Sequence, residues 1–296
     1  MASRYTFGDS DLAVRRMDLV AQVFEPTSRA LLAAAVPAGV DVALDLGCGP
    51  GHTTRLLAAV ARPRRTVGVD GSERYLAHAR AATADHAVDY ICHDVTALPL
   101  PGAPVDAIYA RLLLAHLPDP LGLVERWRSQ LRPGGVLVLD DVEDIDPPAG
   151  VLRDYEQLVV ALVAAEGGPM YAGRLLAPLG GRCVEVHVEV ALAAHIFGMN
   201  LASWRDDALA RGLADADHLD DVADRLAALA DSGTDAGTDT DGGADIDSDA
   251  DGGVGGHSND SDPAGTGDDG DDRAGAAVAV TRPTVRWVLR QVVCPA

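Results

Sequence analysis

Between residues 42 and 141 the chain alternates short apolar runs with Ala-, Leu- and Arg-rich stretches of helical length, and this alternation restricts its fold more than any other feature. The apolar runs have the length of strands and are residues 42–46, 66–70, 88–94, 105–110 and 135–141. The helical stretches between them are residues 53–62, 72–82 and 120–131. Strands that alternate with helices form βαβ units, so the sequence predicts a parallel sheet covered by helices.

The segments on either side extend this pattern. Apolar positions at helical spacing predict a helix over residues 11–36, broken at Pro26. After residue 150 the pattern indicates a helix, a strand, a helix and a last strand, over residues 151–167, 183–192, 200–230 and 284–293. The two late strands bring the predicted sheet to seven.

An acidic segment precedes the last strand. Residues 231–272 contain 14 Asp and neither Glu nor Arg, which leaves −7 of the total charge of −21 for the other 254 residues. The segment is almost all Asp, Gly, Ser, Thr and Ala, so it cannot bury enough apolar surface to offset the entropy of ordering. We therefore expect residues 231–273 to be a disordered insertion. The hexamer DSDADG fits the start of a calcium loop, but Ser258 stands where the bidentate Glu belongs, so we predict no metal site.

Charge and composition exclude several classes of function. All 24 basic residues are Arg and form no basic stripe, which argues against nucleic acid as a partner because phosphate neutralisation supplies most nucleic-acid affinity. No apolar run reaches the ~18 residues of a membrane span, and no secretory pattern opens the chain, so we expect a cytoplasmic protein without a membrane partner. The four cysteines lie far apart, and we expect reduced, buried thiols.

Glycines cluster in the stretch VALDLGCGPGHTT, which contains the first predicted strand. A dinucleotide-binding loop has the spacing G-x-G-x-x-G, which would require its third glycine where His52 stands. The glycines instead follow G-x-G-x-G, at Gly47, Gly49 and Gly51, with Asp45 two residues before the first. Such a loop lets the backbone approach a ligand closely.

This spacing resembles that of class I S-adenosylmethionine-dependent methyltransferases. Further motifs along the chain agree with this resemblance. Asp70 ends the second predicted strand in VGVDGS, Asp94 ends the third in CHDV, and the fourth strand runs into YARLLLAHLPDP. The resemblance covers residues 5–145. It implies S-adenosylmethionine as cofactor and a Rossmann-like, doubly wound α/β fold, with a seven-stranded, mostly parallel sheet, an antiparallel last strand and a helical lid.

The resemblance also implies roles for these residues. Asp45 would act on the cofactor's ammonium group, Asp70 on both ribose hydroxyls, and Asp94 on the adenine amine. The Val95 N–H would meet a ring nitrogen, and the free N–H groups at the helix that starts near His52 would face the carboxylate. The implied cofactor-binding residues are Arg16, Asp45, Gly47, Cys48, Gly49, Gly51, Asp70, Gly71, Ser72, Asp94, Val95 and Arg111.

Two arginines among these have alternatives. The opening YTFGDSDLAVRRMDLVAQVF resembles the lid helix of small-molecule methyltransferases, in which Tyr5 and Arg16 would approach the methionine end of the cofactor. The alternative is a core-flanking helix with surface arginines. Arg111 would line the methionine part of the pocket, or else pair with a neighbouring acid.

Methyl transfer is an in-line displacement, so positioning and exclusion of water supply much of the rate. A base is needed only for an acceptor that carries a proton. We predict His116 in that role because histidine titrates near neutral pH; a loop histidine bonded to backbone is the alternative, and Asp140, Asp141 and Glu143 are further candidates. No N-P-P-Y or D-P-P-Y follows the fourth strand, and the paired-Glu loop of protein arginine methyltransferases is missing, which leaves a small-molecule acceptor.

We expect residues 1–36 to form N-terminal lid helices. Residues 37–230 and 274–296 would form the methyltransferase domain, with further lid helices within residues 151–215. Two other functions stay open. One is a non-catalytic S-adenosylmethionine-binding or interaction protein that works through its acidic segment; the other is an NAD-dependent oxidoreductase, which the missing glycine and the absence of a Tyr-x-x-x-Lys pair disfavour.

Overall fold

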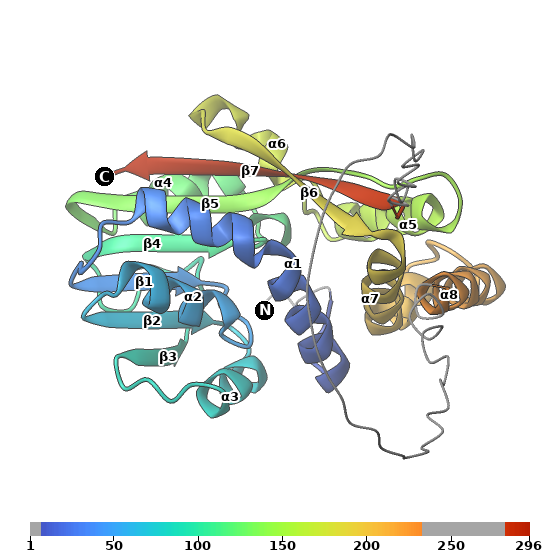
Figure 1. Cartoon of the computed structure of the whole chain (residues 1–296), viewed down its shortest axis with the longest axis horizontal. Coiled ribbons are helices and arrows are strands. Elements are labelled where there is room, and N and C mark those ends of the chain that lie inside the picture. The colour runs from blue at the N-terminus through green and yellow to red at the C-terminus, as the bar shows by residue number, and fades with distance from the viewer. Residues whose placement is uncertain (1–6, 233–281) are drawn as a thin grey trace, which may run out of the picture.

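The computed structural model describes residues 7–232 and 282–296, which form a seven-stranded sheet flanked by helices (Figure 1). The strand order is β3-β2-β1-β4-β5-β7-β6; the strands from β3 to β5 pair in parallel, and β7 is antiparallel to both β5 and β6. The strands are β1 Val42–Leu46, β2 Arg65–Asp70, β3 Val88–Cys92, β4 Val105–Arg111, β5 Leu131–Asp146, β6 Arg182–Glu189 and β7 Thr284–Pro295. The predicted fold class is confirmed.

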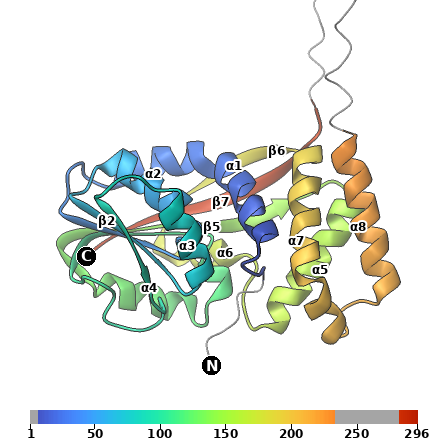
Figure 2. The ribbon, with the colours of Figure 1, turned by 90° about the horizontal axis from the view of Figure 1, so that it is seen from below.

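Helices cover both faces of the sheet. Figure 2 shows α1, α2 and α3 on one face, α4 and α6 on the other, and α5, α7 and α8 beside one end. The helices are α1 Asp11–Ala35, α2 His52–Ala61, α3 Glu73–Ala81, α4 Pro120–Arg128, α5 Val151–Ala165, α6 Ala172–Leu175, α7 Val190–Ala210 and α8 Ala216–Asp231, with 3-10 turns η1 Leu114–His116 and η2 Ala177–Leu179. None of these described helices is long and apolar enough to cross a membrane.

Burial explains the strand patterns. β1 and β4 are central strands, and residues such as Leu44 and Ile108 are fully buried because helices cover both faces. Their sequences therefore read as continuous apolar runs, as expected for buried parallel strands. β6 lies at the sheet edge, and its alternating sequence matches a strand with one covered face.

The helices after residue 150 have an apolar core of their own. Tyr155 of α5 stacks on Phe197 of α7 with ring centroids 4.3 Å apart, and Trp204 is buried beside them. β5 continues to Asp146, well past Asp140, the residue that pairs with the end of β4. This extension carries α5, α7 and α8 alongside the carboxyl ends of the shorter strands (Figure 1).

The prediction that Pro26 breaks the first helix is wrong. α1 continues through Pro26, although its two halves differ in direction (Figure 1). Phe24 and Leu32 are buried on either side of the proline. Burying such side chains contributes about 1.5–3 kcal/mol each, which offsets the ~3 kcal/mol cost of an interior proline.

Two later boundaries also differ from prediction. β6 ends at Glu189, and α7 begins at once, so the predicted strand over 183–192 is too long. The predicted helix over 200–230 is two helices, because Gly212 adopts a φ of 65° and Asp215 caps α8 by accepting the His218 N–H at 2.8 Å. The predicted acidic insertion, with its calcium-like hexamer, lies outside the described residues.

All four cysteines are free, but only Cys48 and Cys294 are buried. The expectation of buried thiols is therefore wrong for Cys92 and Cys183. Both exposed cysteines lie on β3 and β6, the two edge strands of the sheet, where fewer neighbours cover the side chains.

Trp127 of α4 supports the loop after β3. Its indole is fully buried, and Nε1 donates to the Val95 carbonyl at 2.8 Å. We expect Trp127→Ala to lower the free energy of unfolding by about 3–5 kcal/mol, because the change leaves a cavity, and Trp127→Phe to cost less. Chemical denaturation measures this effect. Leu121→Ala, at a 39% exposed position of α4, is the control, and equal losses in both would contradict the assignment.

Candidate functional site

The glycine loop leaves the carboxyl end of β1 and leads into α2. Gly47 and Gly51 have φ values of 65° and 83°, and a Cβ on either would stand 2.5 Å from Leu113 Cδ1 or Tyr90 Oη, respectively. These two positions therefore require glycine both for conformation and for space. At Gly49 the nearest atom to an added Cβ is Met17 Cε at 3.8 Å, an ordinary van der Waals contact, so this position is less crowded than the other two.

Asp45 is buried at the end of β1, directly before this loop. Its Oδ2 accepts hydrogen bonds from the Thr53 and Thr54 hydroxyls at 2.7 and 2.6 Å. Its Oδ1 is buried and has no hydrogen-bond partner. Burial raises the pKa of Asp45 to about 6. A buried acceptor without a donor is unfavourable, so Oδ1 suits a ligand that brings a donor, above all a cationic one.

Asp70, at the end of β2, ties the glycine loop to the next loop. Its Oδ2 accepts the Gly49 N–H and its Oδ1 accepts the Ser72 N–H, both at 2.8 Å. Burial raises the pKa of Asp70. Gly71 has open space around it, and the Ser72 hydroxyl, which caps α3, donates to Asp9 at 2.7 Å. Each Asp70 oxygen keeps a lone pair for a further donor.

The third predicted acid lies on the next strand along the sheet. Asp94 follows the end of β3, where Cys92 pairs with Asp70, and its side chain is exposed. Hydrogen bonds from Thr96 lower the pKa of Asp94. The structure thus brings Asp45, Asp70 and Asp94 to the carboxyl ends of three neighbouring strands, and it buries Val95, the residue that follows Asp94. The roles of these residues toward a cofactor stay predictions.

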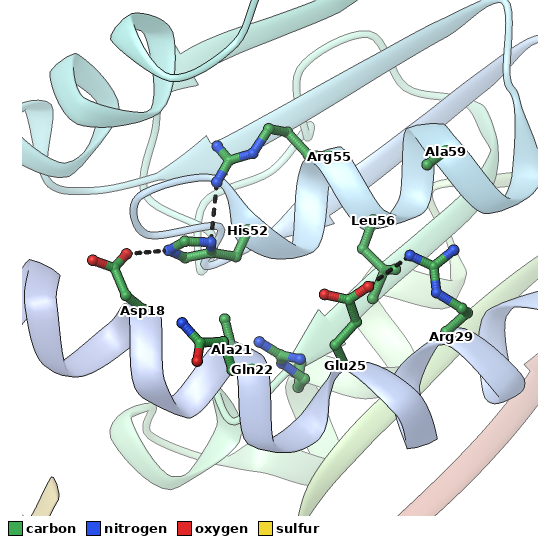
Figure 3. Close-up of a pocket in the computed structure, with 10 residues that line it drawn as sticks. Asp18, Ala21, Gln22, Glu25, Arg29, His52, Arg55, Leu56 and Ala59 are labelled. Carbon is green, nitrogen blue, oxygen red and sulfur yellow. Dashed lines mark hydrogen bonds and ion pairs between the residues drawn. The ribbon is translucent and has the colours of Figure 1, made fainter. Parts of the chain in front are cut away.

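A cavity of about 480 Å³ separates α1 from α2 next to this loop (Figure 3). His52 connects the two helices: Arg55 donates to its Nδ1 at 3.0 Å, so the neutral ring carries its proton on Nε2, which faces Asp18 at 2.8 Å. Burial and Arg55 lower the pKa of His52, which favours this neutral form. The cavity is lined by Asp18, Ala21, Gln22, Glu25, Arg29, His52, Arg55, Leu56, Ala59 and Arg111.

Arg111 belongs to a buried network beneath α1. Its Nη1 donates to the Ser28 hydroxyl at 3.3 Å, which in turn donates to Asp140 at 2.8 Å. Arg111 is 8% exposed and lines the same cavity as His52. From the sequence, Arg111 could either line the pocket or pair with a neighbouring acid. In the structure it does both, because it lines the cavity and is linked to Asp140 through the Ser28 hydroxyl.

The predicted acids Asp140, Asp141 and Glu143 lie on β5 and hold parts of the structure together. Asp140 also accepts from Gln291 and Tyr109, at 3.3 and 3.4 Å. Asp141 accepts the Leu114 N–H at 3.2 Å and so positions η1, and Glu143 pairs with Arg290. These acids are committed to structural partners, which leaves His116 as the predicted base.

His116 ends η1 beneath the N-terminal segment. Its ring meets the Phe7 ring edge-on at 5.1 Å, and its Nδ1 is buried. Burial, together with the Arg16 charge, lowers the pKa of His116 to about 4. The imidazole is therefore neutral at neutral pH and has a lone pair, but it is a weaker base than the sequence suggests.

Arg16 is not the surface arginine that sequence reasoning left open. It is 4% exposed and reaches from α1 to α7, where its Nη1 donates to Asn200 Oδ1. Asn200 Nδ2 donates to the Tyr155 hydroxyl at 2.7 Å. The sequence reasoning missed Asn200 and Tyr155. A signal existed for the first, since Asn200 is a lone amide within the apolar stretch AAHIFGMNLASW.

Asp141 generates a testable pH dependence. Burial raises its pKa to about 7, whereas an unfolded Asp titrates near 3.8. The folded chain therefore holds this proton more tightly, and the stability it contributes at low pH is lost as pH rises toward 7. We expect Asp141→Asn to gain stability relative to the parent chain between pH 5 and pH 8. The gain is about 1.4 kcal/mol for each pH unit in which Asp141 is ionised in the unfolded chain but still protonated in the folded chain.

Chemical denaturation at several pH values measures this difference. Asp146→Asn, at the exposed end of the same strand, removes the same charge and serves as control. A pH profile of Asp141→Asn parallel to that of the parent would contradict the assignment.

Comparisons with known proteins agree with the geometry. Residues 44–139 match the model of the methyltransferase domain family. The chain is 41% identical over 106 residues to a trans-aconitate 2-methyltransferase of Azoarcus sp. strain BH72, a match that covers 36% of this chain and 41% of that protein. It is 33% identical over 136 residues to the 27-O-demethylrifamycin SV methyltransferase of Amycolatopsis mediterranei, covering 43% of this chain and 50% of that protein.

A solved structure of a putative methyltransferase from Bacillus halodurans aligns with 58% of this chain and 78% of its own, at 20% identity and a TM-score of 0.44. The chain spans about half the length of the curated relatives it matches, between 41% and 50% for the two proteins above. The similarity in sequence is therefore centred on the part of the chain that carries the glycine loop and the strand-end acids.

Proposed function

We propose that this chain, whose residues 44–139 are a class I S-adenosylmethionine-dependent methyltransferase domain, transfers a methyl group to a small-molecule acceptor. One observation carries the proposal. The carboxyl edge of the sheet combines the glycine loop, a buried oxygen without a donor on Asp45, and a carboxylate at the end of the neighbouring strand, Asp70, which holds that loop at Gly49.

This edge suits a cationic, hydroxyl-rich ligand. The cofactor's ammonium group would give Asp45 Oδ1 the donor it lacks, and its positive charge would favour the ionised carboxylate. The ribose hydroxyls would use the remaining lone pairs of Asp70. A dinucleotide would instead bring a pyrophosphate close to two buried carboxylates, which like charges disfavour. S-adenosylmethionine, when bound, supplies an activated methyl group on its sulfonium.

The rest of the chemistry falls to the protein's own side chains. The loop Gly47–Gly51 and Asp70 hold the cofactor, and α1 with the helices after residue 150 covers the reaction from water. His116 accepts a proton from an acceptor that loses one, since its ring is neutral at neutral pH. We retain Asp94, Val95 and Arg111 in the cofactor roles that the sequence predicts.

Two curated relatives guide the choice of acceptor. One is named for trans-aconitate, a small carboxylic acid, and the other for a rifamycin. Both names describe small molecules, although chemically distant ones, which supports a small-molecule acceptor without choosing one. Trans-aconitate is therefore the first acceptor to assay with this chain.

Calorimetric titration of the full chain tests cofactor choice. We expect S-adenosylmethionine and S-adenosylhomocysteine to bind and NAD not to bind. Asp70→Ala should weaken binding of both methionine ligands by about 1–3 kcal/mol, the range for lost hydrogen bonds to a charged group. Asp89→Ala, at an exposed position on β3, is the matched control. Binding of NAD alone would refute the proposal, and an unchanged affinity in Asp70→Ala would refute the ribose assignment.

Turnover separates an enzyme from a non-catalytic binding protein. We expect the chain to form S-adenosylhomocysteine from S-adenosylmethionine in the presence of an acceptor, because a cofactor held at the glycine loop would present its methyl group beneath α1 and the helices after residue 150. Mass spectrometry of the acceptor, with trans-aconitate as the first trial, detects the added methyl group. Deletion of residues 231–272 should leave cofactor affinity and turnover intact; a loss of both would favour a role in which the acidic segment does the work.

A further inference from the structure

The guanidinium of Arg16 is buried without a counter-ion. Arg16 is 4% exposed, and no carboxylate of the described residues lies within ion-pair distance of it. Nη1 donates to Asn200, whereas Nε and Nη2 are buried and have no hydrogen-bond partner. Burial of an unpaired charge is strongly unfavourable, so this arginine is expected to serve an anion that arrives from outside.

Other arginines near the core differ in this respect. Arg290 pairs with Glu143, and Arg132 with Asp106 at 3.0 Å. Arg111 reaches Asp140 through Ser28. At the α1–α2 cavity, Figure 3 shows Arg29 paired with Glu25. Arg55 donates there to the Pro50 carbonyl and to His52. Among these arginines, Arg16 is the one with two buried nitrogens that have no hydrogen-bond partner.

The free nitrogens of Arg16 have the geometry for a carboxylate. Nε and Nη2 lie on one side of the planar guanidinium, and their parallel N–H groups match the two oxygens of a carboxylate in a bidentate pair. Asn200, itself held by the Tyr155 hydroxyl, fixes the opposite side through Nη1. The Phe7 ring lies beneath the guanidinium, 5.2 Å away. The guanidinium of Arg16 is thus held in one orientation by groups from the N-terminal segment, α5 and α7.

We propose that Arg16 binds a carboxylate of the methyl acceptor through Nε and Nη2, with Asn200 as positioning residue. This inference rests on the proposed methyltransferase function. It departs from the sequence prediction, which directs Arg16 to the methionine end of the cofactor.

Two observations favour the acceptor over the cofactor. Arg16 donates to Asn200 of α7, which is held by Tyr155 of α5, and both residues lie outside the matched domain of residues 44–139. The cofactor's carboxylate already has a receiver in the free N–H groups at the start of α2, which follows Gly51. The two anionic groups therefore have two separate sites.

The site also connects substrate binding to the predicted base. Arg16 and burial are the two causes that lower the pKa of His116. A carboxylate on Arg16 would neutralise the first of these and make His116 a stronger base when the acceptor is present. Because Nε and Nη2 are closed to solvent, the carboxylate enters when Phe7 or α7 moves aside.

The test uses the full chain saturated with S-adenosylhomocysteine, which occupies the cofactor's own carboxylate site. Acetate, malonate and propane-1,2,3-tricarboxylate are titrated at constant ionic strength, with propane-1,2,3-tricarboxamide as the neutral control, and the thermal midpoint is recorded. We expect a carboxylate to raise the midpoint saturably, and Arg16→Met to weaken its binding about tenfold or more. Arg15→Met, the exposed neighbour on α1, should behave like the parent.

Asn200→Asp provides a second variant that does not depend on removing Arg16. It places a carboxylate beside the guanidinium, so we expect it to raise the midpoint of the unliganded chain and to abolish the response to added carboxylates. An NMR titration of His116 should show a higher pKa in the parent when carboxylate is bound, and no such change in Arg16→Met.

Three results would overturn the inference. The parent may show no carboxylate response, or Arg16→Met may respond as strongly as the parent. Alternatively, Arg16→Met may lose S-adenosylhomocysteine affinity about tenfold while keeping that for 5′-methylthioadenosine, which lacks the amino acid end; Arg16 would then hold the cofactor. Failure of the parent to bind S-adenosylhomocysteine at all would instead refute the proposed function.

Discussion

The carboxylate of Asp45 is buried at the end of the central strand, and the geometry of the site depends on how it is held. Thr53 and Thr54, in the first turn of α2, donate to one of its oxygens and so fix the helix against the strand. The intervening glycine loop must then turn tightly, and Asp70 secures that loop through the Gly49 N–H. The second Asp45 oxygen is buried and has no donor, so only one oxygen of this carboxylate anchors the helix.

The long helix α1 connects this loop to the rest of the molecule. Asp18 reaches His52 at the start of α2, Ser28 joins Arg111 to Asp140, and Arg16 reaches Asn200 on α7. These contacts join one helix to three other parts of the molecule. Any shift of α1 would change the glycine loop, the sheet and the helices after residue 150 together.

Much of the fold could be predicted because local pattern and burial agree there. The central strands between 42 and 141 are buried on both faces, so each appears as an apolar run. Boundaries failed where tertiary contacts outweigh local preference, as at Pro26, or where one glycine divides an amphipathic stretch, as at Gly212. The prediction of buried cysteines failed on β3 and β6 because these strands lie at the sheet edges, where fewer neighbours cover the side chains.

The sequence by itself determined the α/β fold class, the glycine loop and the acids at consecutive strand ends, because strand-to-loop spacing is a local property of the chain. Only the tertiary structure decided which polar groups are satisfied. It paired Glu143 with Arg290, committed Asp140 and Asp141 to structural hydrogen bonds, and, among the described residues, left two nitrogens of Arg16 and one oxygen of Asp45 without hydrogen-bond partners. Hydrogen bonding and charge compensation depend on residues far apart in the chain, such as Arg16 and Asn200, whose proximity no local pattern encodes.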